Sequence, residues 1–259
     1  MITLSSDFGP PYPAAMKGVL CSRTDARLVD VTHEFPRQDV RAAAFWLREV
    51  LPWFPPAVHL VVVDPGVGTE RAALAVRAGE HALVGPDNGV LLPAARRLAE
   101  GSGREEGADP AVEVFEVAYD APESNTFHGR DVFAPAAARV HEAGVGSLES
   151  LSGASPAAEY EDLDFPEPTV EDDGARGEVL VVDGFGNVVT NVPGDALAGV
   201  DAVRVNGTPA PVVRTFADVD PGERLVTVGS HGYVECDVTE GRGDEAFGLS
   251  AGDPVEIRT

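Results

Sequence analysis

Lysine is almost absent from this sequence of 259 residues. Lys17 is the only one among the 19 basic residues, and all the others are arginines, against 43 acidic residues. The resulting net charge of −24 repels nucleic-acid phosphates and anionic membrane surfaces, so we expect neither as a partner. Because the carboxylates are spread along the chain, we interpret them as adaptation to a high-salt (halophilic) cytosol, where screening tolerates them, rather than as a cation-binding surface.

Cysteine is equally scarce, and the patterns of secretion and membrane insertion are missing. Cys21 and Cys236 each stand in or beside an apolar run, which predicts two buried free thiols rather than a disulfide or a metal-binding pair. No basic segment precedes an apolar run at the N-terminus, and no apolar run reaches the length of a membrane span. We therefore expect a soluble, cytoplasmic protein with no membrane partner.

Several common cofactor and catalytic signatures are also missing. The sequence has no GxxxxGK[ST] phosphate loop, no GxSxG nucleophile turn and no GxGxxG at a strand-to-helix junction. The histidines other than His128 show no HxH or HxxxH spacing. We therefore expect no metal site and no cofactor.

The first two thirds of the chain alternate apolar strands with amphipathic helices. Strands are predicted at 2–6, 28–31, 58–63, 73–76 and 81–84, and helices at 14–21, 40–51 (capped by Asp39), 89–99 and 131–143 (capped by Asp131). This alternation predicts a layered α/β domain with a mostly parallel sheet. The glycine-rich stretch 101–110 is predicted to be an exposed loop, and 144–176 to be largely irregular.

The pattern changes after residue 176. Short strands separated by turns are predicted at 178–182, 202–205, 211–214, 225–228, 233–238 and 254–257, with no long helix among them. This pattern predicts a small all-β domain, either a barrel or a sandwich. The expected organisation is an N-terminal α/β domain over 1–165, a linker over 166–176 and a C-terminal β-domain over 177–259.

The segment from Leu60 to Arg71 is the most informative stretch of the chain. An apolar run ends at Asp64, where Pro65-Gly66 breaks the predicted strand. Open α/β sheets bind their ligands at the carboxyl ends of strands, which makes Asp64 and Arg71 candidate site residues. Taken alone, Asp64 fits a turn former or a helix cap equally well.

Three other segments carry chemistry that a ligand site would use. Asp7, at the end of the first strand, can accept hydrogen bonds from vicinal hydroxyls such as those of a ribose. His128 stands at a predicted helix N-terminus, which favours the neutral imidazole, and a neutral His can orient a water or accept its proton. Asp183, Phe185 and Asn187 combine carboxylate, ring and amide in a glycine-rich loop, which suits a small amphiphilic ligand.

Each of these segments also fits a purely structural role when taken alone. Asp7 fits a turn aspartate, His128 a hydrogen-bonded structural histidine, and the loop 183–187 a decorated β-turn. The segment Pro86-Asp87-Asn88-Gly89 is explained completely by a tight turn, since Asn-Gly favours positive φ.

Taken together, the segments resemble the S-adenosylmethionine (SAM) hydroxide adenosyltransferases, a family related to the fluorinating and chlorinating enzymes of SAM. The matching pieces run in the family's order across nearly the whole chain: ITLSSDFG with MKGVL, VDVTHEF with DVRAAAFWL, VVVDPGVGTER, VGPDNGVL, TFHGRDVFAPAAA, VDGFGNVVTN and GSHGYVE. The combination of DPGVGT, PDNG and FHGRD in one chain is specific.

This resemblance implies a fold, an assembly and a reaction. The implied fold is an α/β N-terminal domain with a β-barrel C-terminal domain. The implied assembly is a homotrimer, with each site between the N-terminal domain of one subunit and the C-terminal domain of its neighbour. In the implied reaction, water displaces methionine from the 5′ carbon of SAM and gives adenosine and L-methionine, so that SAM is a substrate and not a cofactor.

The resemblance also implies residue roles. The family's catalytic aspartate, arginine and histidine fall on Asp64, Arg71 and His128. The expected substrate-binding residues are Asp7 for the ribose, with Phe8, Asp87, Asn88, Asp183, Phe185, Asn187, Ser230 and Tyr233.

Two alternatives to the hydrolase remain at this point. A nucleoside- or SAM-binding protein without turnover would keep Asp7 and Asn187 but would not need Asp64, Arg71 and His128 together. A SAM-dependent halogenase is disfavoured, because the halogenating relatives carry a tyrosine at the position of Asp64, where a carboxylate repels a halide.

Overall fold

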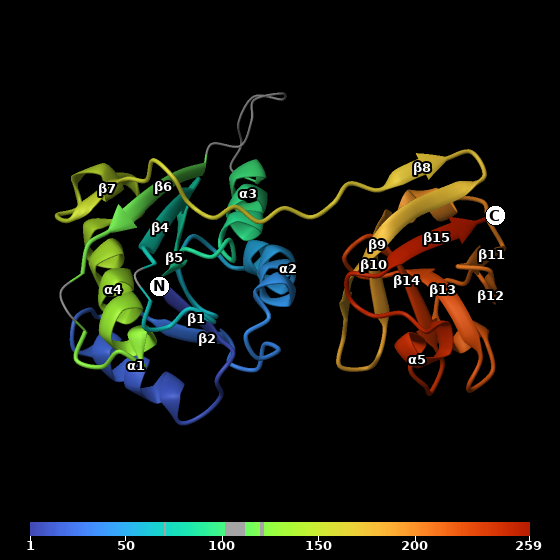
Figure 1. Cartoon of the computed structure of the whole chain (residues 1–259), viewed down its shortest axis with the longest axis horizontal. Helices are drawn as coiled ribbons and strands as arrows, with labels where there is room; N and C mark the ends of the chain where they lie inside the picture. The colour runs from blue at the N-terminus through green and yellow to red at the C-terminus, as the bar shows by residue number, and fades with distance from the viewer. Residues whose placement is uncertain (70, 102–111, 120–121) are drawn as a thin grey trace. The chain divides into compact units, whose positions relative to one another are not determined.

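The chain forms two compact units. The computed structural model describes residues 1–69, 71–101, 112–119 and 122–259. The N-terminal unit spans Met1–Asp164 and the C-terminal unit spans Phe165–Thr259 (Figure 1). The exposed loop predicted over 101–110 lies, except for its first residue, outside the described residues.

The N-terminal unit is a three-layered α/β structure, in which α1 and α4 lie on one face of a sheet and α2 and α3 on the other (Figure 1). Its strands are β1 (Ile2–Ser6), β2 (Leu28–Thr32), β3 (Val58–Val62), β4 (Ala73–Ala78), β5 (His81–Pro86), β6 (Val112–Val117) and β7 (Ala154–Pro156). Its helices are α1 (Tyr12–Cys21), α2 (Val40–Val50), α3 (Leu92–Glu100) and α4 (Ala134–Ala143), with the 3₁₀ turns η1 (Leu51–Trp53) and η3 (Val145–Ser150) and the π-helix η2 (Gly129–Phe133).

The N-terminal sheet is mixed, so the prediction of a mostly parallel sheet holds only for one half. Its order is β2-β1-β3-β5-β4-β6-β7. The β1/β2, β1/β3 and β3/β5 pairs are parallel, whereas β4/β5, β4/β6 and β6/β7 are antiparallel. The change occurs at β4 and β5, because only Gly79 and Glu80 connect them and a link this short permits only a hairpin. The parallel half carries Asp7 and Asp64 at its strand ends.

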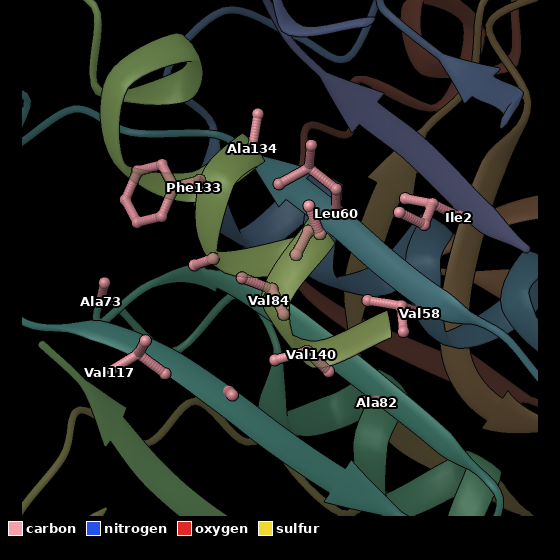
Figure 2. Close-up of a cluster of buried hydrophobic side chains, with 14 of the residues drawn as sticks. Ile2, Val58, Leu60, Ala73, Ala82, Val84, Val117, Phe133, Ala134 and Val140 are labelled. Atoms are coloured by element: carbon pink, nitrogen blue, oxygen red, sulfur yellow. The ribbon is translucent and has the colours of Figure 1, made fainter. Parts of the chain in front are cut away.

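One hydrophobic core lies between this sheet and the helices α1 and α4. Ile2, Val58, Leu60 and Val84 project from the sheet toward Phe133, Ala134 and Val140 (Figure 2). The first helix adds Met16 and Leu20, both fully buried. This packing fixes the start of α4, and therefore the π-helix before it, against the carboxyl end of β3.

Two predicted helix caps have different outcomes. The side chain of Asp39 accepts a hydrogen bond from the Ala42 N–H, so the cap predicted for α2 is confirmed. The cap predicted at Asp131 is wrong. Asp131 lies inside the π-helix, where its carboxylate accepts from the Ser124 N–H at 2.9 Å and pairs with Arg130.

The C-terminal unit is a nearly closed antiparallel barrel. Its sheet runs β12-β11-β15-β9-β10-β14-β13, with β8 paired to β9, and a bridge from Val212 to Val226 links its two ends. The strands are β8 (Thr169–Glu171), β9 (Gly174–Val182), β10 (Val188–Pro193), β11 (Ala202–Val205), β12 (Thr208–Pro211), β13 (Arg224–Val228), β14 (Tyr233–Val238) and β15 (Pro254–Arg258). The remaining elements are η4 (Gly194–Leu197), η5 (Phe216–Asp218) and the short α5 (Gly243–Phe247).

Strands extend into regions predicted to lack them. β8 and the start of β9 lie within 166–176, the stretch predicted to be a linker. β7 and η3 lie within 144–165, which was predicted to be irregular. β7 is held by pairing with the distant β6, which local sequence patterns do not reveal, whereas β8 forms a hairpin with β9 across Asp172 and Asp173.

The two cysteines differ in burial. Cys236 is buried and free, as predicted, whereas Cys21 is free but exposed. The prediction for Cys21 is wrong because it ends α1 one residue beyond Leu20, outside the buried face of that helix. Among the described residues, no helix is both long and apolar enough to cross a membrane.

Candidate active site

Asp64 and Arg71 form an ion pair just beyond the carboxyl end of β3. The Arg71 Nε–H donates to Asp64 Oδ1 at 2.7 Å, and the Arg71 Nη2 contacts the other carboxylate oxygen. The Gly66 N–H also donates to Asp64 Oδ1, at 3.2 Å. Only 6% of the Asp64 side chain and 12% of the Arg71 side chain is exposed. This bidentate contact with a buried guanidinium favours the ionised form of the Asp64 carboxylate.

A further ring holds the arginine in place. The guanidinium carbon of Arg71 lies 5.5 Å from the centre of the Phe133 ring, a cation–π contact. Burial lowers the pKa of Arg71, while the charges of Tyr119 and Asp87 oppose that shift. Arginine remains protonated in this setting, so the pair is a fixed and charged unit.

His128 lies at the start of the π-helix η2 and is 4% exposed. Its Nδ1 has no hydrogen-bond partner among the described residues. Burial lowers the pKa of His128, the charge of Arg71 lowers it further, and Asp131 opposes both effects. The neutral imidazole therefore predominates at pH 7.

A cavity of about 490 Å³ joins Asp64 and His128 in the N-terminal unit. Its walls come from the ends of β1 and β3, the start of α1 and the segment before α4. The lining residues are Asp7, Phe8, Tyr12, Arg37, Gln38, Val62, Asp64, Val67, Ser124, Thr126, Phe127, His128, Gly129 and Arg130. The rings of Phe8, Tyr12 and Phe127 pack edge to face, with centroids 5.5 to 6.2 Å apart. The cavity thus has an aromatic wall beside a polar end.

Gly129 allows the close packing at this polar end. A Cβ at this position would lie 2.9 Å from the Met16 sulfur and 3.2 Å from both Val62 and the Phe127 ring. A larger residue would therefore push His128 and the π-helix away from β3. The requirement for glycine here is steric, because Gly129 does not have a positive φ.

Asp7 opens onto the same cavity. Its Oδ2 accepts a hydrogen bond from the Gln38 N–H at 2.6 Å, and Gln38 has a φ of +62°. The Asp7 side chain also lines the cavity, within reach of a ligand there. Phe8, the other predicted residue in this segment, supplies part of the aromatic wall.

Asp87 and Asn88 do not line the cavity, and their side chains bond to the protein. Asp87 Oδ1 accepts from the Glu161 N–H at 2.8 Å. The Asn88 amide donates to the Val63 carbonyl and accepts from the Val90 N–H. The Asn88 bond ties the end of β5 to the residue before Asp64, whereas the Asp87 bond holds the chain at Glu161.

The other predicted residues belong to the C-terminal unit. Asp183 accepts hydrogen bonds from the Phe185 and Asn187 N–H groups, each at 2.9 Å, and from the Asn187 side-chain amide at 3.1 Å. These bonds fix a turn that leaves the Phe185 ring 80% exposed. Ser230 is exposed in the β13–β14 hairpin, and Tyr233 is half-buried at the start of β14.

Two buried carboxyl groups beside this turn were missed by sequence reasoning. Glu235 and Asp237 lie on β14 and are 9% and 0% exposed. Burial, with the charge of Asp183, raises the pKa of Glu235 to about 6. Burial, with the charges of Glu235 and Asp183, raises the pKa of Asp237 to about 8. The only sequence signal was their alternation with Val234, Cys236 and Val238, and this pattern predicts an exposed face rather than a buried one.

The chemistry available in the N-terminal cavity is activation of a small nucleophile. An ionised carboxylate and a neutral imidazole, on the wall of one cavity, can both accept hydrogen bonds from a water and orient it. Among the described residues, no cluster of His, Cys, Asp or Glu is arranged to hold a metal ion.

Comparisons with known proteins cover nearly the whole chain. The family model of the SAM hydroxide adenosyltransferase N-terminal domain matches residues 2–152, and that of the C-terminal domain matches residues 177–256. A curated protein from Salinispora tropica, named (R)-S-adenosyl-L-methionine hydrolase, is 44% identical over 99% of this chain and 97% of its own length. A protein of the same name from Thermus thermophilus is 42% identical and covers 97% of each chain.

Solved structures resemble the whole chain as well. A crystal structure of an uncharacterised conserved protein from Thermotoga maritima is 35% identical, with a TM-score of 0.82 over all of both chains. A conserved hypothetical protein from Thermus thermophilus is 37% identical, with a TM-score of 0.75 over 99% of this chain and 98% of that one.

Proposed function

The chain belongs to the SAM hydroxide adenosyltransferase family, and we propose that it hydrolyses S-adenosyl-L-methionine to adenosine and L-methionine. The observation that carries the proposal is the set Asp64, Arg71 and His128, two of which line one cavity while the third holds Asp64 ionised. A protein that only binds nucleosides has no need of this set. Hydrolysis is therefore favoured over binding without turnover.

The arrangement suits displacement at the 5′ carbon by water. A sulfonium already leaves as a neutral thioether, so no acid is needed to protonate it. The protein has to hold a water in line with the carbon and to accept a proton from it as the bond forms. Asp64 and His128 accept hydrogen bonds from that water. Arg71 stabilises the charge of Asp64 and fixes its position.

The rest of the substrate binds to residues of both units. Asp7 accepts hydrogen bonds from the ribose hydroxyls, and Phe8 contributes to the aromatic wall. Asp183, Phe185 and Asn187 hold the methionine and adenine ends, with Ser230 and Tyr233 near the methionine end and Asp87 and Asn88 supporting Asp64. SAM enters as a substrate, and neither a metal nor a cofactor takes part.

The assembly we propose is a homotrimer in the cytoplasm. Asp64 belongs to the N-terminal unit and Asn187 to the C-terminal unit, so a complete site needs both. In the trimer, the N-terminal unit of one subunit faces the C-terminal unit of its neighbour. The net charge of −24 gives no attraction to nucleic acid or anionic membranes, which leaves small molecules as partners.

Water rather than chloride is the nucleophile. The dense and dispersed acidic charge fits a cytosol with molar salt, which would bring chloride to the cavity. Ionised Asp64 repels an anion at the attacking position and accepts a hydrogen bond from water. This argues against the halogenase alternative.

The test is to incubate purified protein with SAM in molar potassium chloride and to analyse the products by chromatography and mass spectrometry. We expect adenosine and L-methionine in equal amounts. SAM that stays intact while bound would support the binding-only alternative. A 5′-chloro nucleoside as a major product would refute the role of Asp64.

A further inference from the structure

The C-terminal unit holds a buried carboxyl group that the proposed reaction does not use. Asp237 is 0% exposed, and neither of its side-chain oxygens has a hydrogen-bond partner among the described residues. A buried carboxylate without partners is costly, so such a group either carries a proton or awaits a cation.

The strand register places Asp237 beside the turn of Asp183. Val188 pairs with Cys236 across β10 and β14, and the Asp183 N–H donates to the Asn187 carbonyl at 3.1 Å. If this register is continued by one residue, Asn187 lies opposite Asp237. Asp183, Asn187 and Asp237 then form one row on the same face of three adjacent strands. Asp237 is thus a neighbour of the loop to which we assign the methionine and adenine ends.

Glu235 extends the row toward the β13–β14 hairpin. It lies two residues before Asp237 on the same face of β14, opposite Val189 and Thr227. Its carboxylate lies against the backbone of Gly229, where no Cβ would fit, next to Ser230. The two carboxyl groups therefore lie on one face of β14, between the Asp183 turn and the hairpin.

Among the described residues packed around Asp237, no cation is free to neutralise this group. On β13, the residues opposite Asp237 and Glu235 are Leu225 and Thr227, which carry no charge. On β10 the neighbour is the neutral amide of Asn187. The helix α5 and the residue before it bring Arg242, Asp244 and Glu245, but the Arg242 guanidinium is paired with Asp244 at 2.8 Å and approaches Glu245 at 3.7 Å. The excess charge of the cluster is negative.

We propose that Asp237 is a positioning residue for the α-ammonium group of the substrate: it is protonated in the free protein, and it releases its proton to solvent when the ammonium binds beside Asp183 and Glu235. This inference rests on the proposed function, because SAM supplies the cation. The balance is simple: the O–H bond of the neutral acid breaks, its proton goes to solvent, and the charge of the carboxylate left behind offsets that of the ammonium bound beside Asp183 and Glu235. A pKa of about 8 for Asp237 supports protonation at pH 7 in about nine of ten molecules.

The consequence is substrate binding coupled to proton release. Since the bound ammonium favours the carboxylate, binding weakens as the pH falls below 8. The dissociation constant should rise by up to about tenfold per pH unit in this range. If Asp237 were purely structural, the dissociation constant of the substrate would not depend on the protonation of Asp237.

The experiment measures proton release on binding of L-methionine, a product that carries the same ammonium and does not react. Full-length protein saturated with adenosine is titrated with L-methionine at pH 7 in constant molar salt, in buffers of different ionisation enthalpy. We expect the wild type to release close to one proton per site. A methionine analogue that lacks the amino group should release none.

Asp237→Asn is the matched variant, because it keeps the shape and cannot ionise. We expect it to bind L-methionine without proton release, with circular dichroism checking its fold. A wild type that binds methionine and releases no proton overturns the proposal, whether or not the variant folds. If potassium chloride alone caused proton release, and Asp237→Asn lost that release, the cluster would be a site for an inorganic cation and the proposal would be overturned. Turnover of SAM by the wild type tests the hydrolase separately, so a failure of either idea can be told from a failure of the other.

Discussion

Replacing His128 with alanine should lower turnover strongly and leave substrate binding largely intact. His128 is one of two hydrogen-bond acceptors assigned to the attacking water, and its free Nδ1 has no structural bond to lose. A positioned proton acceptor contributes about 10²–10⁴-fold to the rate, which corresponds to about 2.7–5.5 kcal/mol in the activation barrier. The ribose contacts assigned to Asp7 and the Asp64–Arg71 pair are not touched by the substitution.

The pH profile gives a second readout for the same residue. Burial and the charge of Arg71 lower the pKa of His128 below its ordinary value, so the neutral form persists into mildly acidic solution. Turnover at saturating SAM should therefore fall only below pH 6.5 in the wild type, as the imidazole becomes protonated. In His128→Ala this acid limb should disappear.

The assay is steady-state kcat and KM for adenosine release, followed by chromatography across pH 5 to 8 in molar salt. His141→Ala is the matched control. His141 lies at the end of α4, bonds to Thr24 and lines no part of the Asp64 cavity, so this variant should keep the wild-type kcat. Near-wild-type kcat in His128→Ala would refute the assignment.

Four further outcomes are expected. Asp7→Ala should chiefly weaken binding, by about 1.5–3 kcal/mol in isothermal titration, because its partners are hydroxyls that do not react; unchanged affinity would remove the ribose role. Asp64→Ala and Asn187→Ala subunits, each inactive alone, should regain activity when refolded together, and a fully active monomer in light scattering would contradict the shared site. In dilute buffer the protein should unfold at lower temperature than in molar salt, because 43 acidic residues then repel one another over longer distances; equal melting temperatures would reject the salt adaptation. Acid should destabilise the fold through His59, because burial lowers the pKa of this residue to about 3 and the unfolded chain therefore binds the proton more tightly from pH 6.5 downward. The free energy of unfolding should fall by at most about 5 kcal/mol. Denaturant unfolding of His59→Gln should show a flatter pH dependence than that of the wild type.

Segments with a strong local signal could be predicted from the sequence. The helix α2 follows from its apolar spacing and its Asp39 cap, and β3 follows from four apolar residues ended by Pro65-Gly66. The turn at Gly79-Glu80 was also visible between two apolar strands, and it implied the antiparallel pair that the parallel prediction overlooked.

Other features depend on contacts that the sequence does not display. The predicted cap at Asp131 is wrong because the Asp131 carboxylate accepts hydrogen bonds from the Ser124 N–H and from Arg130. The π-helix itself has no distinctive local pattern. No strand was predicted over the range of β10, although Thr190 and Asn191 are buried with their side chains bonded to the Val234 and Pro166 carbonyls. Alternation along β14 correctly puts Glu235 and Asp237 on one face, but it cannot say that this face is covered.

The two buried aspartates respond differently to pH, and this separates two steps of the proposed reaction. Arg71 holds Asp64 in an ion pair, and burial lowers the pKa of His128, so we assign the acid limb of kcat to His128. Asp237 has no such partner, and the proton it gains in the free protein must leave before the ammonium can bind. Acidification below pH 8 should therefore first raise KM, through the C-terminal unit, and reduce kcat only at lower pH, through the N-terminal unit. The order follows from the contrast between Asp64, which has a fixed guanidinium, and Asp237, which has no hydrogen-bonded cation in the described part of the chain.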